Sequence, residues 1–184
     1  MKNKFAKPNQ ITYIRILLIP VFALFFFIDI PYRDYIAGFI FAMLAMSDML
    51  DGYLARKKNQ VTELGKILDP IADKLLVLTA LILLVDRIPL WMTLVIIVRE
   101  ILVTAMRLFF LPEGVVIGAS KLGKAKTFSQ MTAILAVIWS IPYNVEIMII
   151  SVIITIISGI DYLSDFRKFR KGYSLEIPEP TTAK

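Results

Sequence analysis

Six apolar runs divide most of the chain, and each is long enough to cross the roughly 30 Å hydrocarbon core of a membrane as a helix. They lie at 11–28, 35–55, 68–86, 89–111, 125–141 and 145–164. Hydrophobic residues make up 58% of the 184 residues, which is well above the share in a soluble domain. The sequence therefore predicts an all-α polytopic membrane protein, folded as a six-transmembrane-helix bundle.

The segments between these runs are of two kinds, and their alternation predicts the two sides of the membrane. Short segments with proline, "DIPYRD", "DRIP" and "SIPYN", follow the first, third and fifth runs. Basic residues concentrate in the other segments, "MKNKFAK", "RKKNQVTELGK", "GASKLGKAK" and "RKFRK". Because basic segments tend to stay in the cytoplasm, both termini are expected on the cytoplasmic side.

Residues 1–171 are expected to form one membrane domain, without an internal repeat. The first apolar run is too long for a cleaved signal peptide, so we expect it to remain in the mature protein. Residues 172–184, "GYSLEIPEPTTAK", lose the apolar pattern, which predicts a disordered cytoplasmic tail. The net charge of +6 comes largely from basic residues at the ends of apolar runs, which favours an anionic membrane and phosphate-bearing substrates over nucleic acid.

Four aspartates interrupt the apolar pattern where the second run ends and the third begins. Asp48 and Asp51 are spaced i, i+3, and Asp69 and Asp73 are spaced i, i+4, so each pair shares one helical face. The loop that joins the two runs is expected to be cytoplasmic, so the pairs can face each other at that boundary. Ionised carboxylates within the membrane cost about 2.5–3.5 kcal/mol each to insert, so we expect this group to bind cations.

The chain contains neither Cys nor His, which excludes thiolate chemistry and imidazole as a base or metal ligand. A site made only of carboxylates suits Mg²⁺ or Mn²⁺, and four carboxylates can hold two such ions for phosphoryl transfer. Gly52 leaves space for a ligand near the backbone, and Arg56 can bind phosphate through its guanidinium group. The simpler alternative is that the aspartates are only solvated at a helix end.

This stretch resembles the signature of the CDP-alcohol phosphatidyltransferases, D-x2-D-G-x2-A-R-x8-G-x3-D-x3-D, at every fixed position. The matching residues are Asp48, Asp51, Gly52, Ala55, Arg56, Gly65, Asp69 and Asp73. The layout of six apolar runs also resembles that family. The resemblance implies that a CDP-activated lipid is cleaved at its pyrophosphate, and that the lipid phosphate passes to an alcohol as CMP leaves.

The resemblance also implies a role for each matching residue. All four aspartates are expected to hold the metal ions, and Asp73 is also the expected base for the proton of the attacking hydroxyl. The expected contacts to the CDP-lipid are Gly52, Ala55, Arg56 and Gly65, together with Asn9 and Thr12 in "FAKPNQIT". Capping of the first helix is the alternative role for Asn9 and Thr12. A homodimer is a further implication of the resemblance.

Cationic residues of the fourth and fifth runs are candidates for binding the phosphate of the acceptor. Arg99 and Glu100 fall near mid-membrane in "VREILVTAMR", so we expect both to face the bundle interior. The candidates for the acceptor phosphate are Arg99, Arg107, Lys121, Lys124 and Lys126. Ordinary flanking of the membrane by basic residues is the alternative explanation for the lysines.

The R-E…R pattern and the segment "GKAKT" resemble the bacterial phosphatidylglycerophosphate synthases. This resemblance implies CDP-diacylglycerol as donor, sn-glycerol 3-phosphate as acceptor, and a bacterial cell membrane with the active site facing the cytoplasm. Alternative acceptors are inositol phosphate, serine and phosphatidylglycerol. A divalent-cation transporter is an alternative from another class, because aspartates within a membrane also mark ion pathways. However, all four aspartates lie at one end of their runs, without further acidic residues leading to the other face.

Overall fold

The computed structural model describes the backbone of residues 7–58, 74–110 and 121–176, and the side chains of 16–47, 74–106, 109 and 122–164. Over this part of the chain the regular structure is entirely helical, as the sequence predicts. The helices are α1 (Lys7–Leu24), α2 (Arg33–Lys58), Lys74–Leu83, α4 (Leu90–Phe110), α5 (Lys121–Ile138) and α6 (Asn144–Glu176).

Each of these helices overlaps one predicted apolar run, and the largest difference is at the end of α6. Helix α4 agrees with the predicted run 89–111 to within one residue at each end. Helix α6 continues to Glu176, although its predicted run ended at 164. Its added turns contain several Lys and Arg residues, which have high helix propensity, and they extend a helix that is already nucleated. Residues 172–176 are therefore helical and not disordered, whereas 177–184 lie outside the described residues.

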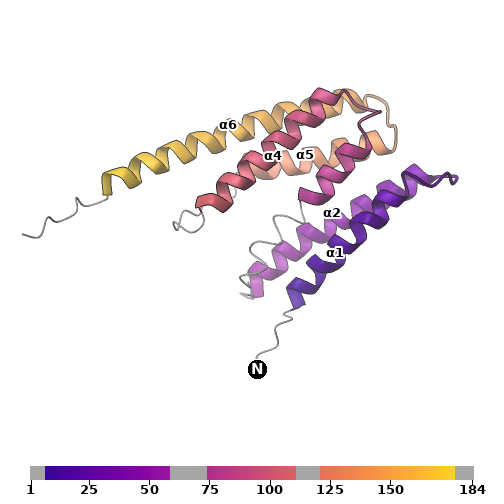
Figure 1. Ribbon diagram of the computed structural model, residues 1–184, viewed down its shortest axis with the longest axis horizontal. Coiled ribbons are helices and arrows are strands. Elements are labelled where there is room, and N and C mark those ends of the chain that lie inside the picture. Colours follow the sequence, from indigo (N-terminus) through magenta and orange to yellow (C-terminus); the bar gives the residue numbers. More distant parts are fainter. Residues whose placement is uncertain (1–6, 59–73, 111–120, 177–184) are drawn as a thin grey trace, which may run out of the picture.

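Three short turns lie together at one end of the bundle, on the right-hand side of Figure 1. Tyr32, Ser140 and Tyr143 have positive φ angles of 62°, 51° and 64°, and these left-handed residues reverse the chain. Arg87, in the turn after Lys74–Leu83, donates to both carboxylate oxygens of Asp34, at 2.8 and 3.0 Å. It also donates to the carbonyl of Ile138 at 3.2 Å, so one guanidinium joins all three turns. We call Asp34, Arg87 and the Ile138 carbonyl the turn-end clasp.

The interior is filled by apolar side chains from neighbouring helices. Helix α5 packs against α2 and α6, α4 packs against α6, and α1 packs against α2. Phe22 of α1 and Phe41 of α2 are fully buried, with ring centroids 5.8 Å apart. Leu81 and Ile134 continue the core between Lys74–Leu83 and α5. This packing fixes the rotation of each helix, and so decides which polar side chains face inward.

Helix α2 comes closest to the end of α5 at Gly38. A Cβ atom added at Gly38 would overlap the indole of Trp139, so only glycine allows this approach. The indole nitrogen Nε1 of Trp139 is buried there without a hydrogen-bond partner. The contact is therefore close steric packing, and a larger residue at position 38 would force the helices apart.

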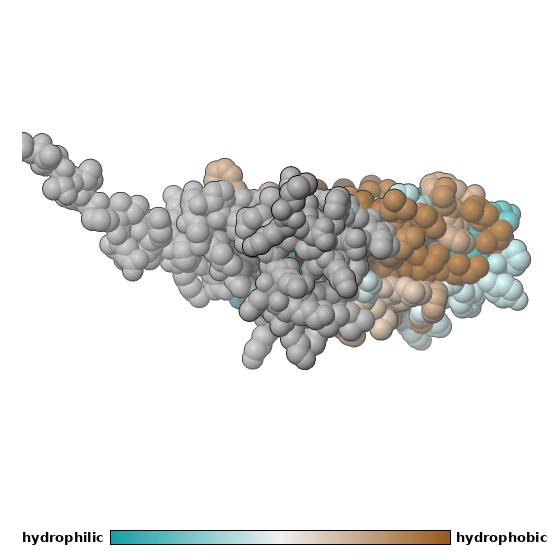
Figure 2. All heavy atoms as spheres, turned by 90° about the horizontal axis from the view of Figure 1, so that it is seen from below, coloured by the Kyte–Doolittle hydropathy of each residue, from teal (hydrophilic) through white to brown (hydrophobic). Residues whose placement is uncertain are grey.

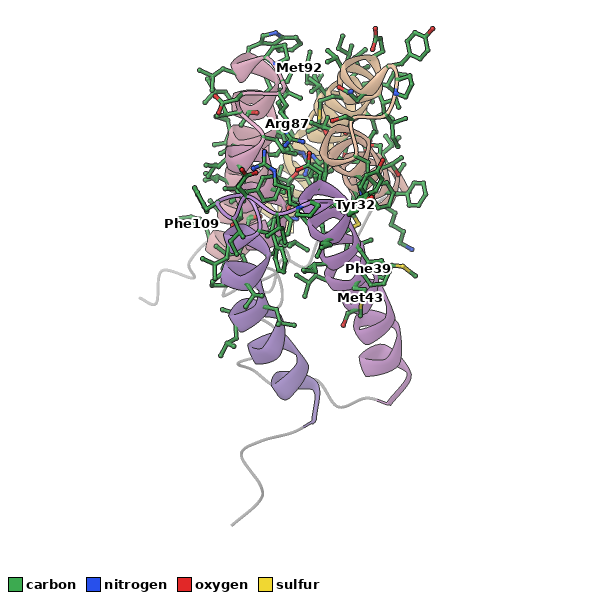
Figure 3. The ribbon with its side chains drawn as sticks, turned by 90° about the vertical axis from the view of Figure 1, so that its right-hand side faces the viewer. Tyr32, Phe39, Met43, Arg87, Met92 and Phe109 are labelled. Carbon is green, nitrogen blue, oxygen red and sulfur yellow. The ribbon has the colours of Figure 1, made fainter. Side chains whose placement is uncertain are left out.

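The outer surface of the described residues is largely apolar. Figure 2 shows hydrophobic residues over much of the described face, with hydrophilic residues near the end opposite the grey atoms. Phe39 and Met43 lie on the outer side of α2, whereas Arg87 lies between the helices (Figure 3). Large exposed apolar surfaces of this kind mark contact with a membrane or with another protein.

Within the described residues, one stretch of helix, Asn144–Ser164, has both the length and the composition to cross a membrane. Helix α4 is long enough, but it carries Arg99, Glu100 and Arg107 within its apolar sequence. These charges must be paired or turned inward if α4 lies in lipid. The residues that surround these charged side chains therefore help to locate the functional site.

Candidate functional site

The helices that carry the predicted site residues have their relevant ends on the same side of the bundle. The start of α1, the end of α2 and the end of α4 all lie away from the turn-end clasp (Figure 1). Asn9 and Thr12 belong to the first turns of α1, and Gly52, Ala55 and Arg56 to the last turns of α2. The side chains of these residues, and all of Gly65, lie outside the described part of the chain.

The predicted metal ligands are described only in part. Helix α2 continues through Asp48 and Asp51, so their i, i+3 spacing is that of a helix. Their side chains, and all of Asp69 and Asp73, lie outside the described residues, and among the described residues no three acidic side chains group to hold a metal. The described part of this helix starts at Lys74, which directly follows Asp73 in the sequence. Among the residues with described side chains, Lys74 is therefore the closest in sequence to the predicted base.

Glu100 is the centre of the best-described polar cluster. Its side chain is 1% exposed, although it lies in the middle of α4. The ammonium of Lys74 lies 2.9 Å from its Oε2 atom. Its Oε1 atom accepts a hydrogen bond from Gln130 at 3.3 Å and forms ion pairs with Arg99, also at 3.3 Å, and with Lys126. We call Lys74, Arg99, Glu100, Lys126 and Gln130 the Glu100 cluster.

Two members of the cluster extend it to α6. Arg99 donates to the hydroxyl of Ser158 at 2.8 Å, and Gln130 donates to the hydroxyl of Thr155 at 3.0 Å. Arg99 also passes beside Gly159, where an added Cβ would lie 3.4 Å from the Arg99 Cγ atom. The expectation that Arg99 and Glu100 face the interior is confirmed, since their side chains are 14% and 1% exposed. One carboxylate thus connects Lys74–Leu83, α4, α5 and α6.

The basic residues predicted to bind the acceptor phosphate do not all face the same way. Lys126 is buried and paired with Glu100, whereas Lys124 is exposed. The two are two positions apart on α5, and a helix turns about 100° per residue, so they point to nearly opposite sides. Lys121 begins α5 and Arg107 lies in the last turn of α4, but their side chains are outside the described residues. Lys126 and Arg99 are therefore the two of this group that the structure brings together.

The Glu100 cluster is rich in cationic side chains. Within the described residues, Lys74, Arg99 and Lys126 all contact the carboxylate of Glu100. Cationic side chains that lie together can bind a phosphate through charge-assisted hydrogen bonds.

Sequence reasoning did not identify Lys74, Gln130 or the central position of Glu100. A signal was present, because Glu100 is an acidic residue within an apolar run. Gln130 follows Lys126 by four positions, so the two lie on one face of α5. The sequence could not reveal that this face meets Glu100, because the meeting depends on how α4 and α5 are rotated.

Known proteins resemble this chain over most of its length. The sequence model of the CDP-alcohol phosphatidyltransferase family matches residues 5–157. A Bacillus subtilis (strain 168) protein named CDP-diacylglycerol--glycerol-3-phosphate 3-phosphatidyltransferase is 40% identical over 182 residues, covering 87% of this chain and 94% of that protein. Proteins of the same name from Rickettsia bellii and Haemophilus influenzae are 40% and 39% identical; they cover 88% and 87% of this chain, and 96% and 92% of their own lengths.

Proposed function

Because the chain belongs to the CDP-alcohol phosphatidyltransferase family, we propose that it transfers the phosphatidyl group of CDP-diacylglycerol to sn-glycerol 3-phosphate. The products are phosphatidylglycerophosphate and CMP. The observation that carries the proposal is the similarity to relatives whose name specifies this donor and this acceptor, over nearly the full length of both chains. The complete signature between Asp48 and Asp73 supports the same reaction.

The metal ligands in this proposal are Asp48, Asp51, Asp69 and Asp73. Their chemistry fits Mg²⁺ or Mn²⁺, because all four offer carboxylate oxygens and the sequence has no competing Cys or His. The helical backbone through Asp48 and Asp51 is compatible with both contributing to one site. Two such ions, when bound, would neutralise charge on the pyrophosphate and on the departing CMP.

In the proposed reaction, the free primary hydroxyl of glycerol 3-phosphate attacks the lipid-linked phosphorus of CDP-diacylglycerol. The bond from that phosphorus to the bridging pyrophosphate oxygen breaks, and CMP leaves with that oxygen. Asp73 accepts the proton of the attacking hydroxyl, since a carboxylate is the available base in a chain without histidine.

The CDP-lipid is assigned to the start of α1 and the end of α2. Gly52, Ala55 and Arg56 lie in the last turns of α2, and α1 packs against α2. Residues of both helices can therefore contribute to one binding site. The assignment accordingly also includes Asn9 and Thr12 of α1, together with Gly65. The amphiphilic donor would then meet the soluble acceptor at one end of the bundle.

The acceptor phosphate is assigned first to Lys126 and Arg99, because these two cationic side chains both contact Glu100 and so lie close together. Lys121, Lys124 and Arg107 remain candidates for the outer part of this site. Helix N-termini attract anions, so the start of α5 at Lys121 adds to the attraction.

Membrane association follows from the apolar surface and from the family. The finer proposal is a protein of the bacterial cell membrane that spans it six times, with both termini and the active site on the cytoplasmic side. It is supported by the alternation of basic segments and short proline-containing segments along the sequence. A homodimer is proposed from the resemblance to the family alone.

The test is CMP release by the purified protein with CDP-diacylglycerol and each acceptor in turn. We expect turnover with glycerol 3-phosphate, and little with inositol phosphate, serine or phosphatidylglycerol. Preferential turnover with one of those three would replace the proposed acceptor. Metal uptake into liposomes without any lipid substrate would favour the transporter alternative.

A further inference from the structure

Glu100 occupies a position that the proposed reaction leaves without a role. Its carboxylate is almost completely buried, although it lies in the middle of α4. Two lysines from different helices, Lys74 and Lys126, pair with its two oxygen atoms. The carboxylate therefore fixes the position of two ammonium groups that come from different helices.

The two lysines that pair with Glu100 are connected to different roles in the proposed site. Lys126 is the buried candidate for the acceptor phosphate, and it is held on Oε1. Lys74 directly follows the proposed base Asp73, so the Cα atoms of the two residues are about 3.8 Å apart. Glu100 therefore contacts the candidate residue for the acceptor phosphate and the residue next to the proposed base.

A lysine bound to Glu100 can still bind phosphate. An ammonium group has three N–H donors, and a carboxylate oxygen that accepts one of them leaves others for a second anion. The lysine side chain has many rotamers, so a fixed carboxylate partner restricts where its ammonium lies. Gln130 restrains the same carboxylate oxygen and is itself bonded to Thr155.

We propose that Glu100 is a positioning residue of the acceptor site, which holds the ammonium of Lys126 in place to bind the phosphate of the acceptor. The inference rests on the proposed function, because it takes glycerol 3-phosphate as the acceptor. Glu100 does not touch the reacting atoms and acts through Lys126. Its removal should therefore weaken acceptor binding more than it slows the chemical step.

The test is a double-mutant cycle with Glu100→Gln, Lys126→Met and both together, measuring kcat and both KM values. We expect Glu100→Gln to raise the KM for glycerol 3-phosphate by about tenfold or more, with the KM for CDP-diacylglycerol within about twofold. Once Lys126 is methionine, Glu100 can no longer act through that lysine, so Glu100→Gln should then add less than about twofold. Glu100→Asp, which keeps the charge, should lie between the wild type and Glu100→Gln.

Asp34→Asn is the matched control, since it makes the same acid-to-amide change at the turn-end clasp and should leave the acceptor KM unchanged. The inference would be overturned if Glu100→Gln and Lys126→Met each raised the KM for glycerol 3-phosphate by a similar factor, and the double variant raised it by the product of the two factors. A normal acceptor KM in folded Glu100→Gln would overturn it as well.

If Glu100→Gln does not fold, the double variant and Glu100→Asp decide the question. The double variant removes both members of a buried pair and should match Lys126→Met in acceptor KM; a value about tenfold above it would refute the inference. Failure of the proposed function looks different, because the wild type itself would then show no CMP release with glycerol 3-phosphate. Activity only with an acceptor that lacks phosphate would overturn the function and the inference together.

Discussion

Among the described residues, two charged clusters lie in different parts of the bundle and differ in burial and in the number of cations around the carboxylate. In the turn-end clasp, Asp34 and Arg87 have side chains that are 30% and 28% exposed. Arg33 lies 3.6 Å from the same carboxylate, but solvent can compensate for this additional charge. In the Glu100 cluster the carboxylate is 1% exposed, and three cations surround it.

The difference separates a structural contact from a candidate site. Asp34 and Arg87 form a pair with good geometry, and solvent screens their charges. In the Glu100 cluster several cations gather on one buried carboxylate, and the proposed acceptor site rests on this arrangement. The clasp holds three turns together, whereas the Glu100 cluster is the proposed place for a phosphate.

The largest expected effect comes from comparing the change of aspartate to asparagine at Asp73 and at Asp34. Asp73→Asn should lower kcat by about 10²–10⁴, the usual contribution of a general base, with little change in the KM for CDP-diacylglycerol. Asp34→Asn should leave kcat within about twofold, since the clasp is not part of the chemistry. CMP release under saturating substrate measures both. A loss confined to CDP-diacylglycerol binding in Asp73→Asn would contradict its role as the base.

The second comparison is between two lysines of α5. Lys126→Met should raise the KM for glycerol 3-phosphate about 10- to 100-fold, because a charge-assisted hydrogen bond contributes about 1.5–3 kcal/mol. Lys124→Met should raise it by at most about threefold, since Lys124 is exposed and solvent screens its charge. Initial rates over a range of acceptor concentrations separate the two. The opposite order would move the acceptor phosphate to the outer face of α5.

The third comparison concerns two glycines that lie beside large side chains. Gly38→Ala should destabilise the protein by about 1–3 kcal/mol, because the new methyl group overlaps the indole of Trp139. Gly159→Ala meets Arg99 at an ordinary contact distance, and alanine favours a helix by about 1 kcal/mol, so stability should be unchanged or higher. Thermal unfolding in detergent gives both values. Equal Tm values for Gly38→Ala and the wild type would mean that α2 and α5 separate easily.

The smallest expected effect is at the clasp. Arg87→Lys keeps the charge but removes the planar fork that contacts Asp34 and the Ile138 carbonyl. We expect a loss of about 1 kcal/mol in the free energy of unfolding, with kcat and both KM values unchanged. The measurements are thermal unfolding and CMP release on the same preparation. A clear change in acceptor KM would show that the two clusters are coupled, against the separation described above.

Much of the fold was predictable from the sequence, because the length of an apolar run is a local property. Helix α4 was predicted to within one residue at each end. The end of α6 was not, because the predicted run was defined by hydropathy, and a helix can continue through basic residues into water. The close contact of Gly38 with Trp139 also has no local signal, since it depends on how α2 and α5 cross.

For the site, the sequence by itself determined the donor chemistry. The spacing of the aspartates from Asp48 to Asp73 and the absence of His and Cys are readable without coordinates. Helical periodicity likewise puts Lys124 and Lys126 on different sides of α5. Only the tertiary structure decided that Lys126 is the one that faces Glu100, and that Lys74 reaches the same carboxylate from another helix. The physical reason is that a sequence gives the angles between side chains on one helix, whereas the rotation of that helix is set by packing against its neighbours.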